Sequence, residues 1–146
     1  MSNRTIPMTD ALYGYYLSAS LREPDILARL RMKTAEHSEG AMQISPEQGQ
    51  FMAFLIRLTG ARRAIEIGTY TGYSALCVAL AMPKGSQLVT CDRRPEWPQI
   101  GQPFWREAGV EDIIDLRIGK AVDTLDAMIA AGEAGSYDFA FIDGDK

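Results

Sequence analysis

The fold of this chain is decided by one stretch, Glu66-Ile67-Gly68-Thr69-Tyr70-Thr71-Gly72-Tyr73-Ser74. It follows an apolar run over residues 63–67, which predicts a strand, and it opens a helical pattern over residues 72–82. Glycine lets the backbone turn tightly and approach a ligand. The N–H groups at the start of the helix, together with Ser74, can bind an anionic group. We therefore expect a strand–turn–helix unit with a ligand at the turn, although a glycine-bearing turn without a ligand gives the same pattern.

The alternation of strand and helix continues toward the C-terminus. Further strands are expected at residues 87–91, 113–118 and 137–142, and further helices at residues 96–108 and 121–131. This alternation is typical of βαβ units around a parallel sheet. The run at residues 137–142 ends almost continuously apolar, which predicts a strand covered on both faces. Because the outer edge of that strand would present unpaired backbone groups, we expect further strands beyond it and interpret the chain as the front part of a longer domain.

The N-terminal part of the chain lacks strand signals and is expected to be helical. Helices are expected from the cap Thr9 to about Ser18, from Asp25 to about Glu36 before a break at Gly40, and from Ser45-Pro46 to Gly60. We therefore expect a helical segment over residues 1–61 and an α/β core over residues 62–146. Together they are expected to form one domain, which suits a chain of 146 residues.

Composition and charge argue against several classes of protein. Fifteen basic against nineteen acidic side chains give a net charge of −4, unlike a binder of nucleic acid or of anionic membranes. No apolar run approaches the ~18 residues of a membrane span, and no signal peptide is expected. The two cysteines, Cys77 and Cys91, fit a reducing cytoplasm, where we expect the protein to work. The single histidine, His37, is expected at the surface, and packing is favoured over a lid for Trp97 and Trp105.

Two residues bear on which ligand the turn binds. Asp92 ends the second strand, twenty residues after Gly72, where an acid can accept both hydroxyls of an adenosine ribose. Tyr70 stands where a dinucleotide fingerprint needs its second glycine, and the carboxylate of Glu66 would repel a pyrophosphate. That carboxylate suits the ammonium and sulfonium charges of S-adenosylmethionine. A methyl donor is therefore favoured, and an NAD(P)-dependent oxidoreductase or a non-catalytic binding module remains an alternative.

A second group of polar residues, Asp143-Gly144-Asp145-Lys146, follows the fourth expected strand. In a doubly wound sheet, ligands bind beyond the carboxyl ends of the strands, so Glu66, Asp92 and Asp143 are expected on one rim. Three acids on one rim repel one another, and a cation is therefore expected there, either the charge of the cofactor or a metal ion. A polar turn is the simpler reading of the same residues.

Three motifs, taken together, resemble the cation-dependent O-methyltransferases, the caffeoyl-CoA and catechol O-methyltransferase group with its bacterial members. They are Met42-Gln43-Ile44-Ser45-Pro46-Glu47-Gln48-Gly49-Gln50, the stretch at residues 66–74, and Asp143-Gly144-Asp145-Lys146. The resemblance runs from about Leu21 to Lys146. It implies a Rossmann-like class I methyltransferase sheet of parallel strands with helices on both faces. In this chain an N-terminal helical segment would precede the sheet, and its C-terminal strands would be missing.

The resemblance also implies the parts of a site. The residues that would bind S-adenosylmethionine are Met42, Ile44, Glu66, Gly68, Thr69, Gly72, Ser74, Asp92, Ala121 and Asp145. Asp143 would be a catalytic residue and a ligand to a divalent cation, for which Mg²⁺ is favoured over Mn²⁺ or Ca²⁺. Lys146 would be catalytic as well and would take the proton of the substrate hydroxyl. The family's further metal ligands, an Asp-Asn pair after the next strand, have no counterpart here. The substrate would be a small hydroxyl compound, catechol-like or CoA-linked and aromatic, and the protein would form a homodimer.

Overall fold

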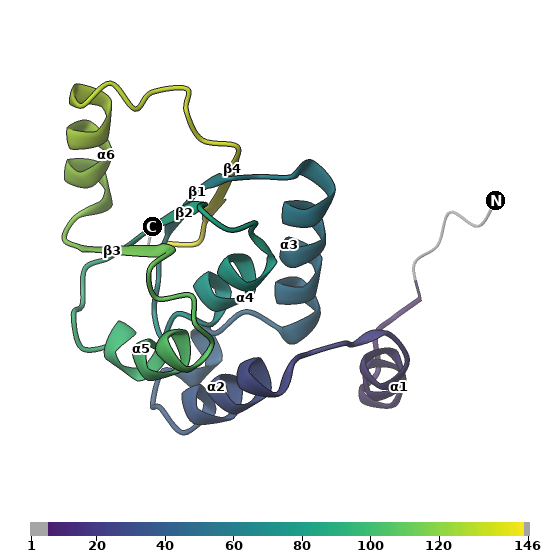
Figure 1. Cartoon of the computed structure of the whole chain (residues 1–146). Coiled ribbons are helices and arrows are strands. Elements are labelled where there is room, and N and C mark those ends of the chain that lie inside the picture. The colour runs from purple at the N-terminus through teal and green to yellow at the C-terminus, as the bar shows by residue number, and fades with distance from the viewer. Residues whose placement is uncertain (1–5, 145–146) are drawn as a thin grey trace.

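The computed structural model describes residues 6–144 of the chain, and Figure 1 shows their arrangement. Helices come first and alternate with strands afterwards. The helices are α1 (Asp10–Ser20), α2 (Asp25–Ala35), a 3₁₀ turn η1 (Gly40–Met42), α3 (Pro46–Thr59), α4 (Tyr73–Ala81), α5 (Pro98–Glu107) and α6 (Ala121–Ala130). The strands are β1 (Arg63–Ile67), β2 (Gln87–Asp92), β3 (Ile114–Ile118) and β4 (Phe139–Ile142). Within residues 6–144, no helix combines the length and hydropathy that a membrane span requires.

All paired strands run parallel, in the order β3-β2-β1-β4. Glu66 of β1 lies opposite Thr90 of β2 and Phe141 of β4, so the carboxyl ends of the central strands meet at one edge. The chain reverses its winding direction after β3, because β4 returns to the far side of β1. The predicted α/β fold with a parallel sheet is confirmed, and its edge is the place where such folds bind ligands.

Helices cover both faces of the sheet, as expected. On one face α2, α3, α4 and α5 enclose the main core around Leu30, Ile56 and Trp105, all fully buried. On the other face α6 packs through Met128 against Val89 of β2, and Figure 1 shows α6 on the opposite side of the sheet from α4 and α5. The apolar runs of β1 and β2 are therefore explained by burial on both faces.

The structure agrees with the expected end of α2 and corrects one other expectation. Helix α2 ends at Ala35, one residue before the expected Glu36. The run ending at Ile142 was expected to be covered on both faces, yet the Ile142 side chain is 76% exposed. The physical reason is that α6 packs against β2, and no helix in the described part of the chain packs over β4 on that face.

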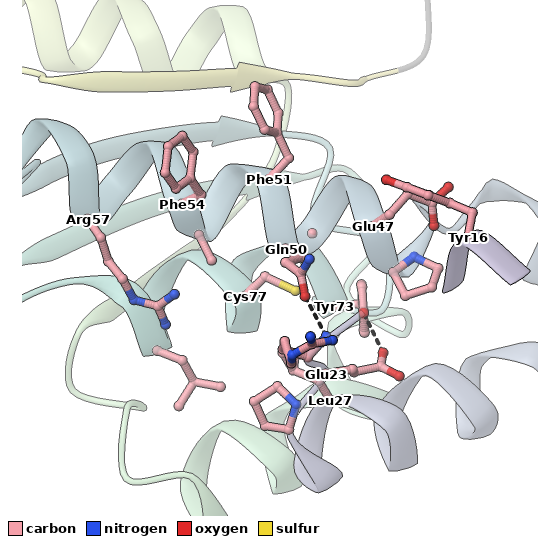
Figure 2. Close-up of a pocket in the computed structure, with 16 residues that line it drawn as sticks. Tyr16, Glu23, Leu27, Glu47, Gln50, Phe51, Phe54, Arg57, Tyr73 and Cys77 are labelled. Atoms are coloured by element: carbon pink, nitrogen blue, oxygen red, sulfur yellow. Dashed lines mark hydrogen bonds between the residues drawn. The ribbon is translucent and has the colours of Figure 1, made fainter. Parts of the chain in front are cut away.

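The helical segment holds the start of α4 in place. Gly49 of α3 packs so closely on α4 that a Cβ atom there would lie 2.7 Å from Cys77 Sγ. The hydroxyl of Tyr73, the first residue of α4, donates a 2.6 Å hydrogen bond to Glu23 before α2. Figure 2 shows Tyr73 and Glu23 pointing toward each other beside a cavity of about 480 Å³ between α2, α3 and α4. These contacts fix the start of α4 relative to the sheet.

Candidate cofactor-binding cleft

A cleft of about 960 Å³ lies at the carboxyl ends of the strands, within the size range of small-molecule sites. Its walls come from chain segments far apart in sequence. They are residues 42–44 around η1, 67–71 after β1, 91–94 at the end of β2, 119–122 before and at the start of α6, and 143–144 after β4. The loops that follow β1, β2, β3 and β4 therefore meet in one place, closed from the side by the helical segment.

Most of the residues predicted to bind the cofactor line this cleft. Those that line it are Met42, Ile44, Gly68, Thr69, Ser74, Asp92 and Ala121, and Asp143, predicted as the metal ligand, lines it as well. Glu66 and Gly72 are not among the lining residues. Asp145 and Lys146 lie outside the described residues. The roles of all these residues in binding or catalysis stay predictions, but the fold brings most of them together.

The glycines of the turn after β1 are required by close packing. Gly68 has φ +101°, and a Cβ atom there would lie 2.6 Å from the carbonyl oxygen of Asp143. Gly72 has φ +77°, and its Cβ atom would lie 2.2 Å from a ring carbon of Trp105. The indole N–H of Trp105 also donates to the carbonyl of Gly72, at 3.1 Å. Contacts within the protein therefore explain why glycine is required at both positions, and a bound ligand is not needed to explain it.

The start of α4 provides a place for an anion at the cleft wall. Gly72 occupies the N-cap position and, having no side chain, leaves the first N–H groups of the helix without a side-chain cap. Ser74, in the first turn, also lines the cleft. A carboxylate placed there would meet free N–H groups and the positive end of the helix dipole.

Glu66 lies beneath the cleft wall and is enclosed by the protein, with 2% of its surface exposed. The Thr90 hydroxyl donates a 2.5 Å hydrogen bond to Oε2, and Oε1 has no partner among the described residues. Burial raises the pKa of Glu66 to about 7, although the hydroxyls of Ser74 and Thr90 oppose the rise, and the charges of Asp143 and Asp92 add to it. The charges of Asp143 and Asp92 thus add to the cost of ionising Glu66. A cation entering the cleft would favour the ionised form of Glu66.

The carboxylate of Asp92, at the end of β2, connects the loop after β1 to the loop after β2. Its Oδ2 accepts the N–H of Tyr70 at 2.7 Å, and its Oδ1 accepts the N–H of Arg94 at 2.9 Å. Its surface is 8% exposed and borders the cleft. Each carboxylate oxygen keeps a second lone pair, so these bonds leave room for the ribose hydroxyls that the sequence analysis assigned to Asp92.

The described residues do not make a metal site by themselves. Asp143 is the predicted ligand, and it lies at the cleft. Between residues 6 and 144, however, no group of three or more histidine, cysteine, aspartate or glutamate side chains is placed to hold a metal ion. A hard cation such as Mg²⁺ prefers six oxygen ligands, and one carboxylate is a poor fit for it.

Sequence reasoning missed part of the cleft wall, including Tyr70, Arg94 and Trp97. Trp97 borders the cleft, whereas Trp105 is buried in the core, and nothing local in the sequence distinguishes the two. His37, which was expected at the surface, is half-buried, and its Nδ1 atom lies 3.1 Å from the Tyr70 hydroxyl.

A parallel α/β sheet with a cleft at its carboxyl edge defines a Rossmann-like cofactor-binding fold. The model of a family described as O-methyltransferase matches residues 17–146, nearly the whole chain. The chain belongs to this O-methyltransferase family. The resemblance predicted from the three motifs is thereby confirmed.

Curated relatives agree with this assignment. The chain is 46% identical over 140 residues to catechol O-methyltransferase domain-containing protein 1 of Mus musculus, covering 96% of the chain and 53% of that protein. It is 41% identical over 151 residues to tricin synthase 1 of Oryza sativa subsp. japonica, covering 99% of the chain and 60% of that protein. The chain thus spans between about half and three fifths of the length of these relatives.

Solved structures show the same fold. The O-methyltransferase TomG of Streptomyces achromogenes, solved in complex with SAM, matches with a TM-score of 0.82 and 29% identity. That match covers 93% of this chain and 63% of TomG. An O-methyltransferase of Bacillus cereus, solved in complex with SAH, matches with a TM-score of 0.79 and 32% identity over 90% of this chain and 60% of that one.

Proposed function

We propose that this chain binds S-adenosylmethionine in the cleft and forms the cofactor-binding part of an enzyme that methylates a hydroxyl group of a small molecule. One observation carries the proposal. The fold brings seven of the ten residues predicted to bind the cofactor, among them Met42, Ser74 and Asp92, to one cleft at the carboxyl edge of the sheet. Two similar structures, solved with SAM or SAH, support the choice of cofactor.

The residues of the cleft fit the three chemical parts of this cofactor. The start of α4 and Ser74 would bind the carboxylate. Asp143 at the cleft and Glu66 beneath its wall would place negative charge near the ammonium and sulfonium groups. Asp92 would accept the ribose hydroxyls. When bound, the cofactor supplies a methyl group on a sulfonium, which a hydroxyl oxygen can take.

The finer parts of the proposal concern the substrate and the metal. Several curated relatives are named caffeoyl-CoA O-methyltransferase, including that of Eucalyptus gunnii, and we propose a catechol-like or CoA-linked aromatic hydroxyl as substrate. Lys146 would take the hydroxyl proton, and Asp143 would contribute to a divalent cation site. The cation remains a prediction because the described residues do not complete such a site. The homodimer and the cytoplasmic location also remain predictions.

A thermal shift experiment tests the cofactor. Only a ligand that binds the folded state raises its melting temperature, so S-adenosylhomocysteine is expected to stabilise the chain and NAD⁺ is not. Stabilisation by NAD⁺ alone would favour the oxidoreductase alternative. Stabilisation by neither ligand at millimolar concentration would contradict the proposal.

A transfer assay tests the reaction. The chain would be incubated with a catechol, S-adenosylmethionine and either Mg²⁺ or a chelator, and methylated product would be measured by mass spectrometry. Product that depends on Mg²⁺ supports the finer proposal. A chain that binds S-adenosylhomocysteine but yields no product would support the alternative of a non-catalytic binding module.

A further inference from the structure

Three aromatic side chains, His37, Tyr70 and Trp97, form a cluster at the cleft, called here the ring cluster. The ring centroids of Tyr70 and Trp97 lie 5.1 Å apart, with the planes at 86°. The His37 centroid lies 5.8 Å from that of Tyr70 and 6.5 Å from that of Trp97, also in edge-to-face arrangements. Such geometry is the favoured one for aromatic pairs. The cluster joins three separate parts of the chain: the turn after α2, the loop after β1 and the loop before α5.

Tyr70 is held in an unusual backbone conformation. Its φ of +47° is the one positive value among the non-glycine residues in the described part of the chain. Such a conformation is disfavoured for a bulky residue and persists only where surrounding contacts determine it. Two contacts do so, the bond from the Tyr70 N–H to Asp92 and the contact of its hydroxyl with His37.

His37 has a defined role in this contact. Its Nδ1 atom accepts the backbone N–H of Glu39 at 3.2 Å, so this nitrogen carries a lone pair rather than a proton. The Tyr70 hydroxyl, 3.1 Å from the same nitrogen, is therefore the donor. His37 itself does not line the cleft, whereas Tyr70 does. An effect of His37 on a bound ligand therefore acts through its neighbours at the cleft, and Tyr70 is the one whose side chain it hydrogen-bonds.

The ring cluster and Asp92 belong to one closed set of contacts. Tyr70 and Arg94 donate their backbone N–H groups to the two oxygens of Asp92. The guanidinium of Arg94 lies 4.5 Å from the ring centroid of Trp97, which completes the circuit back to the ring cluster. Asp92, Arg94 and Trp97 all border the cleft. The orientation of the Asp92 carboxylate is thus tied to the position of Tyr70 and, through it, to His37.

We propose that His37 is a positioning residue for the adenosine part of the cofactor. His37 accepts a hydrogen bond from the Tyr70 hydroxyl and thereby fixes the loop after β1. This loop in turn holds the Asp92 carboxylate so that it faces the ribose. It also links the helical segment, which closes the cleft from the side, to the loop that carries the glycines. This inference rests on the proposed function, because it assigns the ribose of S-adenosylmethionine or S-adenosylhomocysteine to Asp92.

A double-mutant cycle tests the role of His37. The dissociation constant of S-adenosylhomocysteine would be measured by calorimetry for the unmodified chain, His37→Phe, Tyr70→Phe and the double variant. Each single change removes one partner of the hydrogen bond and keeps a ring, and it is expected to weaken binding about 3- to 10-fold. The double variant should bind no more weakly than the weaker single variant, because both changes remove the same bond.

Two further variants separate positioning from a general loss of structure. His37→Asn keeps an acceptor near the place of Nδ1 and is expected to restore affinity to within about 3-fold of the unmodified chain. Tyr13→Phe removes a hydroxyl that bonds to Glu47, away from the cleft, and should leave the dissociation constant unchanged. If His37→Phe fails to fold, Tyr70→Phe and His37→Asn still decide the question.

The outcomes distinguish two kinds of failure. No binding of S-adenosylhomocysteine by the unmodified chain would overturn the proposed function, and the positioning role with it. Binding by the unmodified chain that both single variants retain would overturn the positioning role alone. Effects that multiply in the double variant, or a His37→Asn variant as weak as His37→Phe, would also overturn it.

Discussion

At the scale of single residues, Glu66 is an acid in a place where its charge is costly. It is enclosed by the protein, one of its oxygens lacks a partner among the described residues, and burial raises its pKa to about 7. The sequence predicted an acid near the cofactor because Glu66 ends a strand before a glycine turn. It could not predict that Glu66 lies beneath the cleft wall, because burial depends on Thr90 and α4 from elsewhere in the chain.

The raised pKa predicts how stability changes with pH. Between the ordinary pKa of 4.5 and about 7, the folded chain holds a proton on Glu66 that the unfolded chain has released. The free energy of unfolding therefore falls as pH rises through this window, by up to about 3 kcal/mol, and is highest below it. Glu66→Gln should remove this part of the pH dependence in urea unfolding at pH 5 and pH 8.

The control is Glu36→Gln, which changes an exposed acid of the same charge. It should keep the pH dependence of the unmodified chain. Equal losses of stability between pH 5 and pH 8 in the unmodified chain and in Glu66→Gln would contradict the assignment.

Asp92 gives a second prediction at this scale. Asp92→Asn replaces one carboxylate oxygen by an NH2 group, which cannot accept a hydrogen bond, so the remaining oxygen can satisfy only one of the backbone N–H groups of Tyr70 and Arg94. One buried donor is left without its partner, and the variant should lose about 1–3 kcal/mol of unfolding free energy. Asp126→Asn, at an exposed position on α6, should be nearly neutral. A loss no greater than that of Asp126→Asn would mean that Asp92 does not hold the two loops.

At the scale of elements, local signals predicted the starts and the ends of the α-helices to within two residues. The Thr9 and Ser45 side chains do accept the N–H groups of Leu12 and Gln48, as cap residues do. These bonds span three residues, so the sequence contains all that determines them. The exposure of β4 and the different places of Trp97 and Trp105 depend on which helices cover each surface. A local pattern does not contain that information.

Packing between α4 and α5 gives a prediction that separates two costs of a substitution. Gly72 and Gly132 have nearly the same φ, +77° and +79°, so alanine at either site carries a similar backbone strain, about 1–2 kcal/mol. Only at Gly72 would the new Cβ atom meet the Trp105 ring, at 2.2 Å, whereas nothing lies within 4 Å at Gly132. Gly72→Ala should therefore lose at least about 2 kcal/mol more than Gly132→Ala.

Chemical denaturation of both variants measures this difference. Gly72→Ala is also expected to lose S-adenosylhomocysteine binding, because Gly72 lies at the start of α4, whereas Gly132→Ala is expected to keep it. Equal unfolding free energies would show that Trp105 can move aside at no cost.

At the scale of the whole molecule, the order of strands and the motif together predicted the fold and the class of cofactor. The alternation of strands and helices determines the parallel sheet, and the parallel sheet gathers the loops at one edge. Of the helical segment, only Met42 and Ile44 were predicted to line the cleft. The contact of His37 with Tyr70 joins residues far apart in sequence, so no local sequence pattern predicts it.

Metal binding is a prediction at this scale because it needs ligands from several segments. Since the described residues offer no complete ligand set, Mg²⁺ below about 1 mM should not shift the melting temperature of the chain in the absence of cofactor. A chelator should be equally without effect on the unliganded chain. A dissociation constant for Mg²⁺ in the micromolar range would contradict this expectation.

The proposed function requires the cleft at the carboxyl edge of the sheet to hold the methyl donor. A crystal structure of the chain grown with S-adenosylhomocysteine would show whether it does. We expect the ligand in the cleft, with its carboxylate at Ser74 and its ribose hydroxyls at Asp92. Ligand bound elsewhere on the molecule, or an empty cleft at saturating ligand concentration, would contradict it.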